Sequence, residues 1–136
     1  MQKDFKEIIK AVETFHNSFG IKNEYLPKGE ISEADYTLRH RLMQEENEEY
    51  LQAAKDGDLV EVADALGDQL YILCGTILKH GLQDKIVEVF EEIQRSNMSK
   101  LDENGKAIYR EDGKILKSNL YFKPNIKEVL EGEKAV

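Results

Sequence analysis

Residues 42–71 read LMQEENEEYLQAAKDGDLVEVADALGDQLY, and this stretch decides the fold. Two segments rich in Leu, Ala and Glu flank the turn sequence Lys55-Asp56-Gly57-Asp58, in which Asp58 can cap the helix that follows. Two helices that are joined by a short turn pack antiparallel. The stretch therefore predicts an antiparallel pair, with one helix over about 33–55 and the other over about 59–79.

The acidic residues of this pair follow the inner faces of the two helices. Glu45 and Glu49 continue the apolar stripe of the first helix, Glu46 lies beside them, and Glu48 falls on the rim. Three acids share one narrow face of the second helix: Glu61, Asp64 and Asp68. Because buried carboxylates repel each other, they need a proton or a cation. Six facing carboxylates form a cage of hard oxygen ligands, which suits Mg²⁺ or Mn²⁺.

The remaining sequence predicts short helices followed by a flap. Apolar periodicity indicates a first helix over about 3–19 and a fourth over about 82–96. The segment 71–78 is apolar on nearly all sides, so we expect the third helix to be central and covered on both faces. The dipeptides Asn104-Gly105 and Asp112-Gly113 predict a small hairpin, and 125–131 one or two last helical turns.

Together these elements predict a single all-α domain over residues 1–136, built as a four-to-five-helix bundle. The helical core extends over about 3–96, and a C-terminal flap and tail over 97–136. The third helix needs more apolar cover than four short helices supply, which favours self-association.

Composition excludes several classes of partner. The 136 residues include 19 basic and 27 acidic ones, a formal net charge of −8. This charge argues against nucleic acid and against anionic membranes as partners. The longest apolar stretch, around 70–78, is too short to span a bilayer, and the polar start predicts no signal peptide. The single cysteine, Cys74, excludes an internal disulfide and fits a cytoplasmic protein.

The two acidic motifs resemble those of a known enzyme family. Glu45-Glu46-x-x-Glu49 followed by Glu61-x-x-Asp64 resembles the EExxE and ExxD signature of the all-α nucleoside triphosphate pyrophosphohydrolases. That group includes MazG-type enzymes, phosphoribosyl-ATP pyrophosphohydrolases and the all-α dUTPases and dCTPases. The resemblance covers about residues 5–124, and the tail from Arg95 to Lys117 is most similar to the dUTPase-like branch. In the register of many members a Glu would stand at Ala65, so this chain uses Glu61 or Asp64 instead.

The resemblance implies cleavage of a nucleoside triphosphate, such as dUTP or dCTP, between its α and β phosphates. It implies magnesium, with manganese as an alternative, and a homodimer or homotetramer. We expect Glu46, Glu49, Asp64 and Asp68 to be the main metal ligands. Glu45 is the first candidate to orient the attacking water, although it is equally a candidate ligand. Which of Glu61 and Asp64 binds the metal directly stays open.

We expect the substrate contacts to come from residues outside the two acidic helices. Candidates for binding phosphate or sugar lie in the fourth helix and the tail: Arg95, Asn97, Ser99, Lys100, Lys114 and Lys117. His16 and Phe19 are candidates for a wall against the base, with a place in the core as the alternative. His40 is expected to be exposed, and Tyr71 and Cys74 to serve packing.

Three other interpretations are kept. The first is a phosphoribosyl-ATP pyrophosphohydrolase, and the second is a non-catalytic helical module that binds nucleotides or regulates. The third is a di-iron bundle, which needs Glu-x-x-His on two helices, whereas this sequence supplies only Glu13-Thr-Phe-His16.

Overall fold

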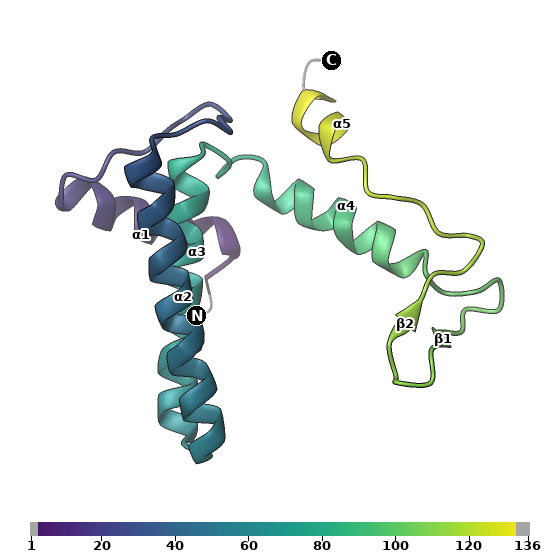
Figure 1. The fold of residues 1–136 in the computed structure, drawn as a ribbon. Helices are drawn as coiled ribbons and strands as arrows, with labels where there is room; N and C mark the ends of the chain where they lie inside the picture. The colour runs from purple at the N-terminus through teal and green to yellow at the C-terminus, as the bar shows by residue number, and fades with distance from the viewer. Residues whose placement is uncertain (1–2, 133–136) are drawn as a thin grey trace. The chain divides into compact units, whose positions relative to one another are not determined.

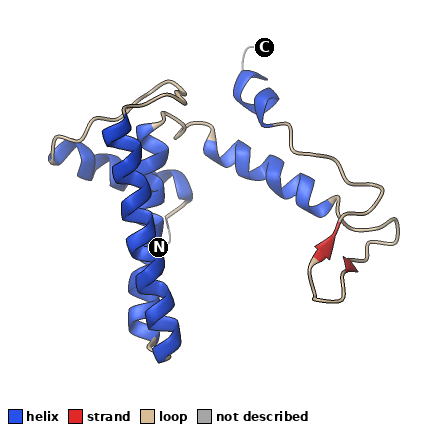
Figure 2. Cartoon of the chain, in the orientation of Figure 1, coloured by secondary structure: helices blue, strands red, loops and turns tan. Residues whose placement is uncertain are grey.

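A computed structural model describes residues 3–132, and these residues form five helices and a two-stranded hairpin (Figures 1 and 2). The elements in chain order are α1 (Phe5–Ser18), α2 (Glu33–Asp56), α3 (Leu59–Lys79), α4 (Ile86–Met98), β1 (Ile108–Tyr109), β2 (Ile115–Leu116) and α5 (Ile126–Glu131). The predicted all-α class with a small hairpin is confirmed. The chain divides after Asp84 into an N-terminal and a C-terminal unit, so α4 belongs with the tail.

α2 and α3 form the predicted antiparallel pair, and they lie side by side in Figure 1. The side chain of Ser32 caps α2 by accepting the backbone N–H of Asp35. Gly57 ends this helix with a φ of 65°, in the left-handed region that favours glycine. The Asp58 carboxylate then accepts the N–H of Glu61 at 3.1 Å and starts α3. The predicted end of α2 and start of α3 are confirmed, because local capping residues set both.

The loop between α1 and α2 is tied to the C-terminal end of α3. The Glu24 N–H donates to the Leu78 carbonyl at 2.9 Å, and the Gln83 side chain donates to the Glu24 carbonyl at 2.8 Å. Gly81 has a φ of 66°, and a Cβ there would lie 2.1 Å from the Leu26 carbonyl oxygen. These contacts hold residues 82–85 in a turn. The fourth helix therefore begins at Ile86, and the prediction that it begins near Leu82 was wrong.

Within the N-terminal unit, only part of α3 is covered on both faces. Leu66, Leu70 and Leu73 are 48%, 38% and 44% exposed. α1 has only 14 residues, and it contacts the C-terminal half of α3 near Tyr71 and Gly75. A row of leucines along α3 therefore stays uncovered by the residues of the N-terminal unit.

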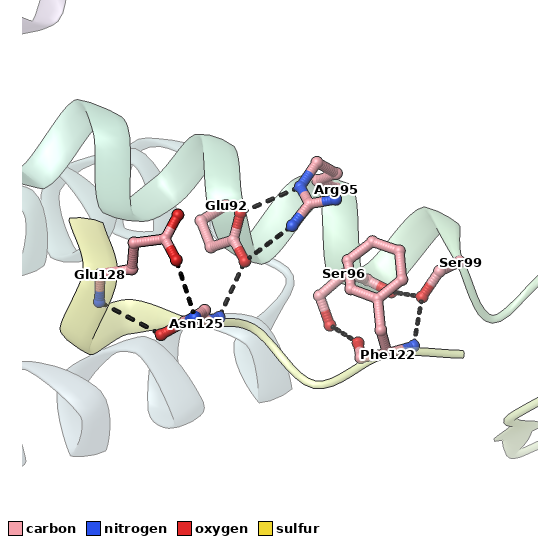
Figure 3. Close-up of polar contacts among 7 residues, drawn as sticks. All are labelled: Glu92, Arg95, Ser96, Ser99, Phe122, Asn125 and Glu128. Carbon is pink, nitrogen blue, oxygen red and sulfur yellow. Dashed lines mark hydrogen bonds and ion pairs between the residues drawn. The ribbon is translucent and has the colours of Figure 1, made fainter. Parts of the chain in front are cut away.

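The C-terminal unit is held together by a strap, residues 118–125, that returns along α4 (Figure 3). The hydroxyl of Ser96 donates to the Phe122 carbonyl at 2.8 Å, and the Phe122 N–H donates to the Ser99 hydroxyl at 3.1 Å. At the end of the strap, the Asn125 N–H donates to the Glu92 carboxylate, and the Asn125 side chain caps α5. The predicted last helical turns are thus confirmed.

Candidate active site

The centre of the site is a buried glutamate between α2 and α3. Glu46 is only 9% exposed, and its Oε2 atom is buried without a hydrogen-bond partner. Burial and the nearby carboxylates of Glu49 and Asp68 raise the pKa of Glu46 from 4.5 to about 7. These three acids of the two helices therefore lie together, as the sequence predicts. A buried carboxylate with an unpaired oxygen is a group that needs a cation or a proton.

The other predicted acids lie on the exposed flanks of the same helix pair. The expectation that all six point into the bundle was wrong, because five are exposed: Glu45, Glu49, Glu61, Asp64 and Asp68. The inner line of α2 passes through Arg39, Glu46 and Ala53, which are spaced by seven residues. The sequence pattern centred the inner face on Leu38 and Leu42 instead, and so placed Glu45 and Glu49 too far inward.

This acidic surface provides oxygen ligands without a closed coordination shell. Among residues 3–132, no three His, Cys, Asp or Glu side chains are grouped closely enough to hold a metal ion as they stand. Near the α2–α3 turn, a shallow hollow is lined by acids and their neighbours, including Glu49 and Glu61. The donor set is made of carboxylate oxygens, which fits magnesium or manganese and does not fit zinc. The unpaired Oε2 of Glu46 supports the same fit.

A cavity of about 220 Å³ lies one helical turn from these acids and is called here the His16 pocket. Leu42 lines it four residues before Glu46, and Ile72 lines it four residues after Asp68. Four residues span about 6 Å along a helix, and the antiparallel helices make both steps point the same way. The acids and the pocket therefore follow each other along the α2–α3 helix pair.

Aromatic side chains form one wall of the His16 pocket. The rings of Phe15 and Tyr71 meet edge to face, with their centroids 5.6 Å apart. Phe19 is 68% exposed and stacks on Phe15 outside this wall, at 4.5 Å. Tyr71, predicted to serve packing, is thus a pocket residue as well, whereas Cys74 is fully buried as expected.

His16 is 3% exposed, and its Nδ1 atom lies 2.6 Å from the Asn23 side-chain oxygen. Burial lowers the pKa of His16, and the charges of Arg39 and Lys79 lower it further. Both cations line the pocket, and the sequence interpretation missed them. A signal was available, since Arg39 precedes the buried Glu46 by seven residues and so shares its face of α2.

The predicted phosphate-binding residues all belong to the C-terminal unit, where several have structural partners. Arg95 donates to Glu92 and lies over the Phe122 ring, 4.3 Å from its centroid (Figure 3). The Ser99 hydroxyl donates to the Ser96 carbonyl. Lys117 lies over the Tyr121 ring at 4.7 Å. Asn97 is exposed on α4, Lys100 follows this helix, and Lys114 precedes β2 on the exposed hairpin. Their substrate role stays a prediction.

Comparison with known proteins identifies the family. The family model described as phosphoribosyl-ATP pyrophosphohydrolase matches residues 12–97, which include α2, α3 and every acid of the site. The chain belongs to this family. Its members form part of the MazG-like all-α nucleoside triphosphate pyrophosphohydrolases, so the resemblance seen in the sequence is confirmed. No curated protein matches the sequence significantly.

Membership of this family establishes the class of chemistry. The protein is a hydrolase that acts on phosphoric anhydride bonds, with a pyrophosphohydrolase function on nucleotide substrates. This finding favours an enzyme over a non-catalytic module. Enzymes of the phosphoribosyl-ATP pyrophosphohydrolase family commonly depend on divalent metals. No helix within residues 3–132 is long and apolar enough to cross a membrane.

Proposed function

We propose that the protein cleaves a nucleoside triphosphate between the α and β phosphates, releasing a monophosphate and pyrophosphate, with Mg²⁺ or Mn²⁺ as cofactor. The observation that carries this proposal is Glu46, a buried carboxylate with an unpaired oxygen that lies against Glu49 and Asp68. A triphosphate brings roughly four negative charges, so acids and substrate repel unless cations lie between them. We propose dUTP or dCTP as the substrate class, because the tail resembles the dUTPase-like branch.

Glu46, Glu49 and Asp68 would hold the metal, with Asp64 and Glu61 as the next candidates. A bound divalent ion neutralises the phosphates and helps to stabilise the charge that develops on the leaving pyrophosphate. Glu45 is exposed beside Glu46 and is the candidate base that orients and deprotonates the attacking water. The aromatic wall of the His16 pocket, one turn away, would position the nucleoside.

A second candidate substrate is phosphoribosyl-ATP, because the matching family model carries that description. A single panel distinguishes the two: dUTP, dCTP, the other common nucleoside triphosphates and phosphoribosyl-ATP, each with Mg²⁺ or Mn²⁺. We expect pyrophosphate release that EDTA abolishes. Glu49→Gln should lose this activity, while Glu48→Gln, on the rim of the same helix, should keep it. No turnover anywhere in the panel, or an active Glu49→Gln variant, would contradict the proposal.

We also propose that two copies of the chain associate through the exposed leucine row of α3. Leu66, Leu70 and Leu73 present a contiguous apolar row on the central helix, and burying each leucine gains about 1.5–3 kcal/mol. Light scattering after size exclusion should give at least twice the 15.7 kDa chain mass. Leu70→Glu should shift the mass toward the monomer, and a monomeric unmodified protein would contradict the proposal. The cytoplasmic location stays a prediction.

A further inference from the structure

The side chains of Asn17 and Asn23 form a hydrogen-bonded series that ends at His16. The Asn23 amide nitrogen donates to the Asn17 side-chain oxygen at 3.3 Å, so its carbonyl oxygen is the atom that faces His16. That oxygen can only accept, and therefore the Nδ1 atom of His16 carries the hydrogen. In a neutral imidazole the Nε2 atom is then left as an acceptor. The two asparagines thus lock one tautomer of a buried histidine.

The missing side chain of Gly75 leaves space for both this acceptor and the guanidinium of Arg39. A Cβ at position 75 would lie 3.0 Å from His16 Nε2 and 2.6 Å from Arg39 Nη2. Both groups therefore approach the α3 backbone at the same point. Arg39 is held there by two hydrogen bonds of 3.1 Å, to the Ile72 carbonyl and to the Thr76 hydroxyl. These bonds use two of its five N–H donors.

Lys79 provides a second donor in the same pocket. Its side chain is 9% exposed, and its Nζ atom donates to the Lys22 carbonyl at 2.9 Å. Asp35 lies 3.6 Å from this ammonium and is 44% exposed. The His16 pocket is therefore lined by the locked acceptor of His16, two cationic donors, the Asp35 carboxylate beside Lys79 and an aromatic wall.

We propose that the His16 pocket recognises the imide edge of a pyrimidine base, with His16 Nε2 accepting the ring N–H and Arg39 and Lys79 donating to the flanking carbonyl oxygens. An imide offers acceptor, donor and acceptor in sequence, which complements the donors of Arg39 and Lys79 and the acceptor of His16. Cytosine has an unprotonated ring nitrogen at the central position, so two acceptors would face each other. The inference rests on the proposed function, because it assumes that the substrate is a nucleotide.

The test uses ligands, so it does not depend on a variant that folds. Uridine, 3-methyluridine and cytidine are titrated into the unmodified full chain in EDTA, with binding followed by NMR. We expect uridine to bind at least about 10-fold more tightly than the other two, since each loses the N–H donor. Equal binding of uridine and 3-methyluridine, tighter binding of cytidine, or no binding of uridine would overturn the proposal.

Two measurements test the role of His16 itself. The ¹⁵N chemical shifts of its ring should show a protonated Nδ1 and an unprotonated Nε2, and the reverse would overturn the proposal. His16→Phe should remove the preference for uridine over 3-methyluridine, while His40→Phe, an exposed histidine of α2, should keep it. A His16→Phe variant that folds and still discriminates would also overturn it.

The pyrophosphate assay separates this inference from the proposed function. If uridine binds selectively in EDTA while no nucleotide is cleaved, the proposed function fails and base recognition stands. If nucleotides are cleaved but uridine and 3-methyluridine bind alike, only the base recognition fails.

Discussion

The N-terminal unit carries the whole net charge of the protein, whereas the C-terminal unit is neutral. Residues 1–84 include nine basic and 17 acidic side chains, a net −8, and residues 85–136 include ten of each. In the first unit, the buried Oε2 of Glu46 has no hydrogen-bond partner. In the second, Ser96, Ser99 and Ser118 all donate to backbone carbonyls.

The difference separates a cluster that holds an unsatisfied buried carboxylate from a strap and a helix whose serine hydroxyls are paired. Buried polar groups in proteins are normally satisfied, and an exception needs a reason such as an absent ion. Like charges held together in the N-terminal unit lower its stability until a cation binds. The strap of the C-terminal unit gains stability from the hydrogen bonds it already makes.

The largest expected effect comes from Glu46→Gln, because it removes the unsatisfied carboxylate that distinguishes the N-terminal unit. If Glu46 binds the metal as proposed, pyrophosphate release should fall by about 100-fold, since a metal ligand contributes several kcal/mol to catalysis. The metal-free protein should gain about 1 kcal/mol in its free energy of unfolding, because a repelled buried charge is removed. Activity assays and denaturation in EDTA measure the two effects. A Glu46→Gln protein that is both active and less stable would contradict this account.

Two glycines of α3 offer a matched pair of substitutions. Gly75→Ala should lower the free energy of unfolding by about 1–2 kcal/mol, because its Cβ displaces Arg39 from two hydrogen bonds. Gly67 has no atom within 4 Å of the equivalent Cβ position, so Gly67→Ala should gain up to about 1 kcal/mol from helix propensity. Urea denaturation of both variants gives the comparison. Equal changes in the free energy of unfolding for the two variants would show that a side chain at position 75 does not disturb Arg39 or His16.

Ser96→Ala tests the strap of the C-terminal unit. Ser96 is 2% exposed and its hydroxyl donates to the Phe122 carbonyl, so its loss should cost about 1–2 kcal/mol. Hydrogen exchange at the Phe122 amide, which donates to Ser99, should become faster. Gln94→Ala, an exposed change on the same helix, is the control and should leave that exchange rate unchanged. An unaffected Ser96→Ala protein would show that the strap is held by other contacts.

The smallest expected effect is a pH dependence from His16. Burial keeps its pKa below 6.5 in the folded chain, so the unfolded chain binds more protons as the pH falls below that value. Stability should therefore be fully present above about pH 7 and decline toward pH 5, by at most about 1.4 kcal/mol per pH unit. The Glu46→Gln background removes the opposite effect of the raised Glu46 pKa. His16→Gln should flatten this decline, and His40→Gln should not.

Local signals in the sequence were enough to predict α2, α3 and the meeting of three acids between them. Ser32, Gly57 and Asp58 act on neighbouring backbone groups, so the ends of α2 and the start of α3 could be read directly. The spacing of the acids also indicated that Glu46, Glu49 and Asp68 meet, because two helices joined by a short turn have few ways to pack.

Which acid is buried, and which residues surround the His16 pocket, depends on packing between segments that are distant in the sequence. Glu46 lies on the inner line of α2 because Arg39 and Ala53 share that face, and a small rotation of the helix would have buried Glu49 instead. The tautomer of His16 depends on Asn23, and the position of Arg39 depends on the missing side chain of Gly75, 36 residues further along. Such contacts come from packing between distant segments, which local periodicity does not encode.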